Sequence, residues 1–62
     1  GICVDLNDNI FVCDYGNNRV QIFDSNGVYI NQIVVAQPLC AAINHKTQEI
    51  IVCGDDNKIS IF

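Results

Sequence analysis

The chain has 62 residues, three basic and seven acidic side chains, and half of its residues are hydrophobic. A composition this apolar excludes an intrinsically disordered segment. The net charge of −4 comes without the basic stripe that nucleic-acid binders carry. No run reaches the roughly 18 consecutive apolar residues of a membrane span. The sequence therefore indicates a folded, acidic chain and argues against nucleic-acid and membrane partners.

Short runs of β-branched and aromatic residues, separated by Gly, Asn and Asp, predict β-strands along the whole chain, with no helix longer than one turn. The Asn26-Gly27 dipeptide predicts a hairpin turn, since both residues tolerate positive φ. Pro38 is expected to interrupt the strand ladder. The seven predicted strands are Ile2–Asp5, Ile10–Asp14, Arg19–Asp24, Val28–Val34, Ala41–Asn44, Ile50–Gly54 and Lys58–Phe62.

The pattern of Ile10–Phe23 returns in degraded form at Ile50–Phe62. Cys13 corresponds to Cys53 in this comparison. The strand Ile10–Asp14 is apolar on both faces, as expected for a strand that is covered on both sides. Stacked sheets of a propeller provide such cover, whereas a two-sheet sandwich does not explain a self-repeat of about 40 residues.

The segment Asp14-Tyr15-Gly16-Asn17-Asn18-Arg19-Val20-Gln21-x-Phe23, preceded by Gly1-Ile2-x-Val4-Asp5, resembles the NHL repeat. This resemblance implies an all-β fold, an NHL-type β-propeller fragment. It implies one four-stranded blade over 1–35 and three strands of a second, incomplete blade over 36–62. Because so small a chain buries only about 60% of its unfolded surface, we expect it to need further blades or self-association.

Up-and-down strand order predicts which loops share an end of the blades. The loops between the second and third strands of each blade, Tyr15–Asn18 and Asp55–Asn57, should lie beside the linker Val35–Leu39. We call these two the b–c loops. The turns Leu6–Asn9, Ser25–Gly27 and His45–Glu49 should lie at the opposite end. Loops on a rigid scaffold are where binding residues concentrate, so the end with the b–c loops is the candidate binding surface.

Seven residues at that end are the candidate binding residues. An exposed tyrosine gives a large contact area at low entropic cost, which favours Tyr15. Asp14 and Arg19 are expected to form a structural pair across the base of the first b–c loop, with direct ligand contact by Arg19 as the alternative. Gly54 stands where the first repeat has Asp14, so Lys58 lacks an equivalent partner. The candidates are Tyr15, Asn17, Asn18, Arg19, Asp56, Asn57 and Lys58.

The four cysteines are expected to be free and to act as small buried hydrophobes. Their spacing contains no C-x₂₋₄-C pair of the kind that binds zinc. Cys13 and Cys53 should occupy equivalent buried positions. A disulfide between Cys3 and Cys13 stays open, because it depends on a one-residue choice of register.

Other chemistry is not expected. His45 is the only histidine and has no partners for a nucleophilic triad. Asp5-Leu6-Asn7-Asp8-Asn9 begins like an EF-hand loop but lacks its Gly and Glu, which predicts a turn instead. We therefore predict no catalytic residues, no metal and no cofactor.

The expected function is a non-catalytic binding or scaffolding module that mediates protein–protein interaction through the b–c loops. The resemblance leaves two alternatives. One is an RNA-binding NHL propeller, which the net charge disfavours. The other is a propeller enzyme, a lyase or hydrolase, with its active site in other blades. The compartment is unknown, and the absence of an N-x-[ST] site leans towards the cytoplasm.

Overall fold

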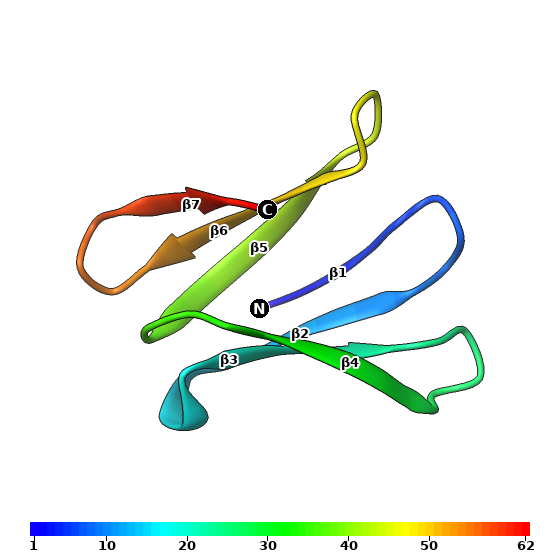
Figure 1. Ribbon diagram of the computed structural model, residues 1–62, viewed down its shortest axis with the longest axis horizontal. Helices are drawn as coiled ribbons and strands as arrows, with labels where there is room; N and C mark the ends of the chain where they lie inside the picture. Colours follow the sequence, from blue (N-terminus) through cyan, green and yellow to red (C-terminus); the bar gives the residue numbers. More distant parts are fainter.

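The computed structural model describes residues 1–62 as seven β-strands in two antiparallel sheets (Figure 1). The first sheet has the order β1 (Ile2–Val4), β2 (Ile10–Asp14), β3 (Arg19–Phe23), β4 (Tyr29–Val34). The second has the order β5 (Pro38–Asn44), β6 (Glu49–Gly54), β7 (Ile59–Ile61). A single 3-10 turn, η1 (Tyr15–Asn17), joins β2 to β3. The prediction of an all-β fold with one four-stranded sheet and three further strands is confirmed.

The largest difference from the predicted strand bounds concerns Pro38. We expected it to interrupt the ladder ahead of a strand starting at Ala41, whereas it is the first residue of β5. It is fully buried and pairs with Gly54 of β6. Proline is tolerated at the first position of a strand, because its missing N–H removes no interior ladder bond there. The register shifts directly after it, between Pro38 and Cys40.

The turn between β3 and β4 uses one left-handed residue rather than the two expected. Gly27 has φ +80° and donates its N–H to the Asp24 carbonyl (2.9 Å), while Asn26 is not left-handed. The Asp24 carboxylate accepts hydrogen bonds from the N–H groups of Asn26 and Val28, both at 2.9 Å. This is a three-residue hairpin loop with glycine at its left-handed position, a common alternative to the two-residue turn.

Asp5 organises the turn between β1 and β2 in the same way. Its backbone N–H donates to the Asn9 carbonyl (3.1 Å), and Asp8 has φ +62°. Its carboxylate accepts from the N–H groups of Asn7 (2.8 Å) and Asn9 (2.9 Å). Burial alone would raise the pKa of Asp5, but these bonds, together with one from the Asn9 side chain, outweigh it and lower that pKa. The turn predicted here is present.

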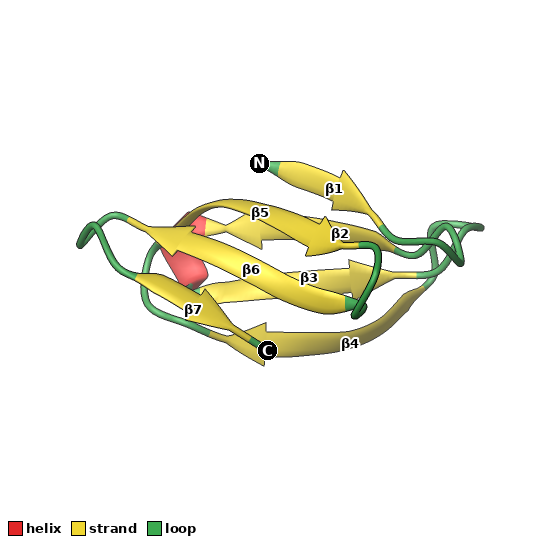
Figure 2. Ribbon diagram, turned by 90° about the horizontal axis from the view of Figure 1, so that it is seen from above, coloured by secondary structure: helices red, strands yellow, loops and turns green.

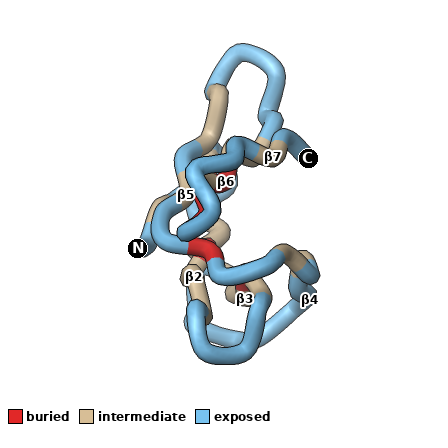
Figure 3. Tube along the Cα trace, turned by 90° about the vertical axis from the view of Figure 1, so that its left-hand side faces the viewer, coloured by how far each residue is buried: buried red, intermediate tan, exposed pale blue.

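The hydrophobic core lies between the two sheets (Figure 3). Phe11, Val20 and Ile22 come from one face of the first sheet, where Phe11 pairs with Ile22. Val52 reaches them from the second sheet. All four are buried, and Val20 is completely inaccessible to solvent. Burial of side chains of this size contributes about 1.5–3 kcal/mol each, so this small cluster is what fixes one sheet against the other.

The face of the second sheet that points away from this core is open. It carries Ile59 and Ile61, which are 68% and 60% exposed. In the repeat comparison, the residues of this open face are the counterparts of the residues that the first sheet buries. The two sheets therefore stack head to tail, because equivalent faces point the same way. The counterparts are Phe11 and Ile51, Cys13 and Cys53, Val20 and Ile59, and Ile22 and Ile61.

Candidate functional site

The two b–c loops and the linker lie at one end of the molecule, and the other three turns lie at the opposite end (Figures 1 and 2). We call residues 14–19, 35–39 and 54–58 the loop rim. The loop rim contains all seven candidate binding residues. His45 lies in the exposed turn between β5 and β6, at the other end.

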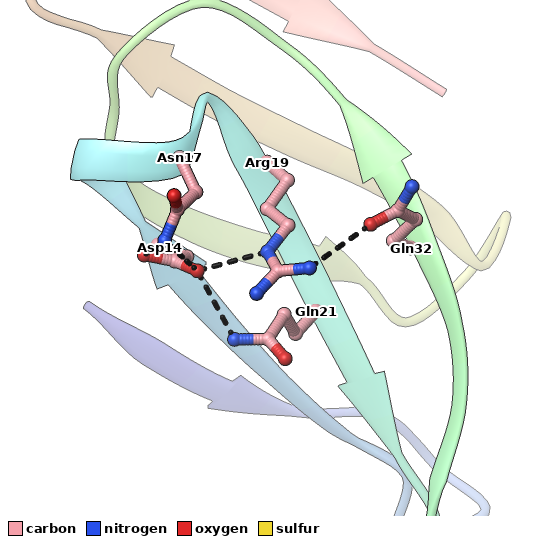
Figure 4. Close-up of polar contacts among 5 residues, drawn as sticks. All are labelled: Asp14, Asn17, Arg19, Gln21 and Gln32. Carbon is pink, nitrogen blue, oxygen red and sulfur yellow. Dashed lines mark hydrogen bonds and ion pairs between the residues drawn. The ribbon is translucent and has the colours of Figure 1, made fainter.

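Asp14 is the centre of a polar cluster at the end of β2 (Figure 4). Its Oδ2 accepts from Arg19 Nε at 2.8 Å, from Asn17 Nδ2 at 3.0 Å and from Gln21 Nε2 at 3.2 Å. Arg19 Nη1 also donates to Oε1 of Gln32 on β4, at 3.3 Å. The hydrogen bonds from Arg19 and then Asn17 hold the pKa of Asp14 below its ordinary value. Arg19 thus connects three neighbouring strands, β2, β3 and β4, and Asn17 fastens η1 to the end of β2.

Asn18 holds the linker against the first b–c loop. It is left-handed, with φ +52°, and its N–H donates to the Tyr15 carbonyl at 3.3 Å. Its own carbonyl accepts from Val35 N–H (3.1 Å), and its Oδ1 accepts from Gln37 N–H (2.9 Å). Asparagine tolerates this conformation better than most residues, which accounts for its presence here. Asn18 therefore ties the end of β4 to the loop of its own blade.

The two sheets are joined on the rim by Tyr15 and Asp55. The Tyr15 hydroxyl donates to Asp55 Oδ2 at 2.5 Å, and Asp55 N–H donates to the Gln37 carbonyl at 3.1 Å. The hydrogen bond to the Asp55 carboxylate, followed by burial, raises the pKa of the Tyr15 phenol. Together with the bonds of Asn18, these contacts form a circuit through both loops and the linker.

Gln37 and Asp55 also belong to this circuit, although neither is among the candidate binding residues. One sequence signal points to Asp55. Tyr15 and Asp55 are 40 residues apart and hold the same position in successive repeats. Contacts between equivalent positions are expected where repeats stack directly on one another. No comparable signal marks Gln37, whose left-handed backbone (φ +43°) follows from the path of the linker.

The second b–c loop leaves its polar side chains in solvent. Asp56, Asn57 and Lys58 are exposed, and the single ion pair of the chain is Asp14–Arg19, so Lys58 has none. Asp56 Oδ1 accepts from Lys58 N–H at 3.1 Å, and Asn57 is left-handed with φ +62°. A Cβ at Gly54 would stand 3.0 Å from Asp56 Oδ1 and 3.3 Å from the Ala36 carbonyl oxygen. An aspartate equivalent to Asp14 at Gly54 would therefore require the Asp56 side chain and the Ala36 carbonyl to shift.

All four cysteines are free, and none is fully buried. The expectation of buried cysteines is thus wrong. Cys13 and Cys53 hold equivalent positions and are both half-buried, but Cys13 lies against the core while Cys53 lies on the open face. Cys3 pairs with Phe11, and Cys13 N–H donates to the Gly1 carbonyl (2.9 Å), so Cys3 and Cys13 do not face each other across the strands. The pKa values of Cys3, Cys13 and Cys53 are raised, and burial is the largest cause in each case.

The surface contains no pocket, and no three potential metal ligands lie together. The chain also has no helix that is long and apolar enough to cross a membrane.

Comparison with known proteins identifies the repeat. Residues 1–23 match the family model described as NHL repeat. The similarity to the NHL repeat thus covers the first 23 residues. It is also similar to Protein lin-41 of Caenorhabditis elegans, with 53% identity over 32 residues. That match covers 52% of this chain but only 3% of lin-41. No solved structure matches the chain at a significant level. The four-stranded sheet and the three-stranded sheet are consistent with blades of the NHL type.

Proposed function

We propose that this NHL-repeat chain is a non-catalytic binding and scaffolding module that contacts a protein partner through the loop rim. The observation that carries the proposal is the Tyr15–Asp55 hydrogen bond, which joins the loops of two blades. Because of this bond and the contacts of Gln37, the rim is one surface with a fixed shape rather than two separate loops. A preorganised surface loses less entropy when it binds.

The exposed chemistry of the rim favours a protein partner over RNA. Tyr15 is 42% exposed and offers an aromatic face beside polar loops, a composition found in protein recognition surfaces. Asp55 and Asp56 place two carboxylates on the same surface, and Arg19 is engaged by Asp14. A phosphate backbone would meet these carboxylates and only one unpaired cation, Lys58. The rim is therefore suited to a polar or basic protein surface.

The proposal also assigns a role to the two blades as a unit. Residues 1–35 and 36–62 are proposed to be successive blades, with further blades of the same kind covering their open faces. The head-to-tail stacking of the two sheets supports this assignment, since the open face of the second sheet carries the counterparts of a face that the first sheet buries. In such an assembly the rim loops of successive blades would form one continuous binding surface.

The test compares two surface variants in pull-down and RNA cross-linking assays with the protein in its full natural length. The rim variant combines Tyr15→Ala and Lys58→Ala. The matched control combines His45→Ala and Lys46→Ala, two exposed residues of the opposite end. We expect the rim variant to lose the proteins that the unchanged chain retains, and the control to keep them. Loss in the control alone, or RNA cross-linked at Tyr15, would refute the proposal.

A further inference from the structure

We propose that Cys40 and Cys53 form a dithiol site that a hydroperoxide oxidises to a disulfide at the base of the loop rim. The two residues are direct partners in the antiparallel pair of β5 and β6. Both are free thiols, and both lie on the open face of the second sheet, where Cys40 is exposed. A further blade of the kind proposed above would cover this face, so the site is accessible to a hydroperoxide while the face is open.

The ladder places this pair at a spacing that suits a disulfide. Ile50 exchanges both backbone hydrogen bonds with Phe62, and Gly54 N–H donates to Lys58, so these residues of β6 bond away from β5. Successive residues of a central strand bond alternately to the strands on either side. Cys53 therefore bonds towards β5 and makes a hydrogen-bonded pair with Cys40. Such pairs have Cα atoms about 5.5 Å apart, and disulfides prefer about 5.5–6 Å.

The first blade provides an internal comparison. Cys13 is the counterpart of Cys53, but its partner across the strands is Gly1, whose carbonyl accepts from Cys13 N–H at 2.9 Å. The position that holds a thiol in the second blade therefore has no side chain in the first. Cys3 lies opposite Phe11 instead. Of the cysteines, only Cys40 and Cys53 are direct cross-strand partners.

The two thiols differ in a way that sets the order of the reaction. Cys40 is exposed and Cys53 is half-buried, so a hydroperoxide reaches Cys40 first. The Cys40 thiolate attacks the peroxide oxygen, which gives a sulfenic acid and, after protonation of the leaving oxygen, water. The Cys53 sulfur then attacks the Cys40 sulfur, and the S–OH group leaves as a second water with the Cys53 proton. The balance is two thiols and one hydrogen peroxide to one disulfide and two waters.

The disulfide would fasten the linker to the second b–c loop. Cys40 follows the linker residue Leu39, and Cys53 precedes Gly54, the first residue of the rim in that loop. The backbone bond from Asp55 to Gln37 already joins the same two segments. Oxidation would add a covalent link beside this hydrogen bond, which by itself can open.

The experiment treats the reduced chain with one equivalent of hydrogen peroxide, in a buffer where circular dichroism shows its β-structure, and maps the product with trypsin. Cleavage after Arg19, Lys46 and Lys58 places Cys3 and Cys13 together in 1–19, Cys40 in 20–46 and Cys53 in 47–58. We expect the 20–46 and 47–58 peptides to be linked, in about tenfold excess over a disulfide within 1–19. An excess of the disulfide within 1–19, a statistical mixture, or irreversible oxidation without any disulfide would overturn the proposal.

Two comparisons separate the structural effect from chance encounter. The Cys3→Ala/Cys13→Ala variant should form the disulfide at the rate of the unchanged chain, whereas Cys40→Ala/Cys53→Ala should form none. In concentrated urea the preference should reverse, because the loop between Cys3 and Cys13 is the shorter one and closes more readily in an unfolded chain. The same preference in urea as in buffer would show that the sheet register does not direct the reaction.

Discussion

Individual side chains in this molecule hold segments together more often than they face solvent freely. Asp14 receives hydrogen bonds from Asn17, Arg19 and Gln21. Asn18 receives two from the linker. Asn17, Asn18 and Arg19 were expected to bind a partner. Their polar groups form hydrogen bonds within the molecule that fix the shape of the loop. Of the candidates on this first loop, Tyr15 retains the largest apolar surface for a partner.

The first prediction concerns the loss of stability at acidic pH. Because the bonds to Asp14 lower its pKa from the ordinary 3.8, the stability they contribute is fully present above that value. It is lost as the pH falls through the lower pKa of the folded state. In the protein at its full natural length, melting temperatures between pH 6 and pH 2 should therefore decline less steeply in Asp14→Asn than in the unchanged protein. Parallel curves for the two proteins would mean that the cluster is not formed in solution.

The second prediction concerns Tyr15. Its hydrogen bond to Asp55 raises the pKa of the phenol above 10.0, so it should ionise later than an ordinary tyrosine in an ultraviolet titration. Since the raised pKa belongs to the folded state, the stability from this bond is present below pH 10 and is lost at higher pH. Asp55→Ala should return the titration towards the ordinary value, and Asp56→Ala should leave it unchanged. Equal shifts in the two variants would rule out a specific bond.

Among the secondary-structure elements, turns rather than strands carry the conformational constraints. The turns after β1 and β3 each use an aspartate carboxylate to bind the backbone and a left-handed residue to close the loop. The turn after β6 keeps the left-handed residue, Asn57, but has Gly54 at the aspartate position. Its backbone bonds are retained, with Gly54 N–H donating to Lys58 at 3.0 Å.

The third prediction compares two glycines. Gly27 has φ +80°, which is costly for any residue with a Cβ, whereas Gly16 lies in η1 without positive φ and with open space around it. Gly27→Ala should lower the free energy of unfolding by about 1–2 kcal/mol. Gly16→Ala should change it little or raise it slightly, since alanine loses less backbone freedom on folding. Denaturant titration of the protein in its full natural length measures both, and an equal loss in the two variants would contradict the assigned turn geometry.

The strands were predictable because their residue types and the internal repeat agree on the same elements. The start of β5 was not predictable, because proline in a sequence indicates a break in a strand, whereas it is tolerated when it is the first residue. The Asp14–Arg19 proximity follows from the hairpin alone. The roles of Gln37 and Asp55 do not, since they depend on how the linker crosses from one blade to the next. Local chemistry thus located the rim, and packing between blades determined its internal bonds.

At the scale of the whole molecule, apolar surface is the dominant feature. Six of the 62 residues are buried, while large hydrophobic side chains stand exposed on the outward faces of both sheets, Ile2 at 68% and Ile59 at 68% among them. Covering each such side chain would contribute about 1.5–3 kcal/mol, against a stability of about 5–15 kcal/mol for an ordinary domain. The two outward faces are apolar, like the two inward faces that pack together to form the core.

The fourth prediction follows for the isolated 62 residues. They should not behave as a stable monomer but should associate or remain partly unfolded, which sedimentation at micromolar concentration measures. Ile59→Asp should lower the association, because it places a charge on the open face, while Lys46→Asp on the exposed turn should not. A monodisperse species of 6.9 kDa with a cooperative thermal transition would contradict the prediction.

The bond between Tyr15 and Asp55 joins one position to its own counterpart 40 residues later. Because of such a link, we expect sequence to be inserted or deleted in units of one whole repeat. Duplicating or deleting one complete repeat keeps every residue in step with its counterpart, so each rim bond finds a new equivalent donor or acceptor position. Inserting a single residue in the linker would put all later positions out of step at once. A change in length is compatible with the bond where it falls after the bonded position. The second b–c loop is one residue shorter than the first, and the shortening comes after Asp55.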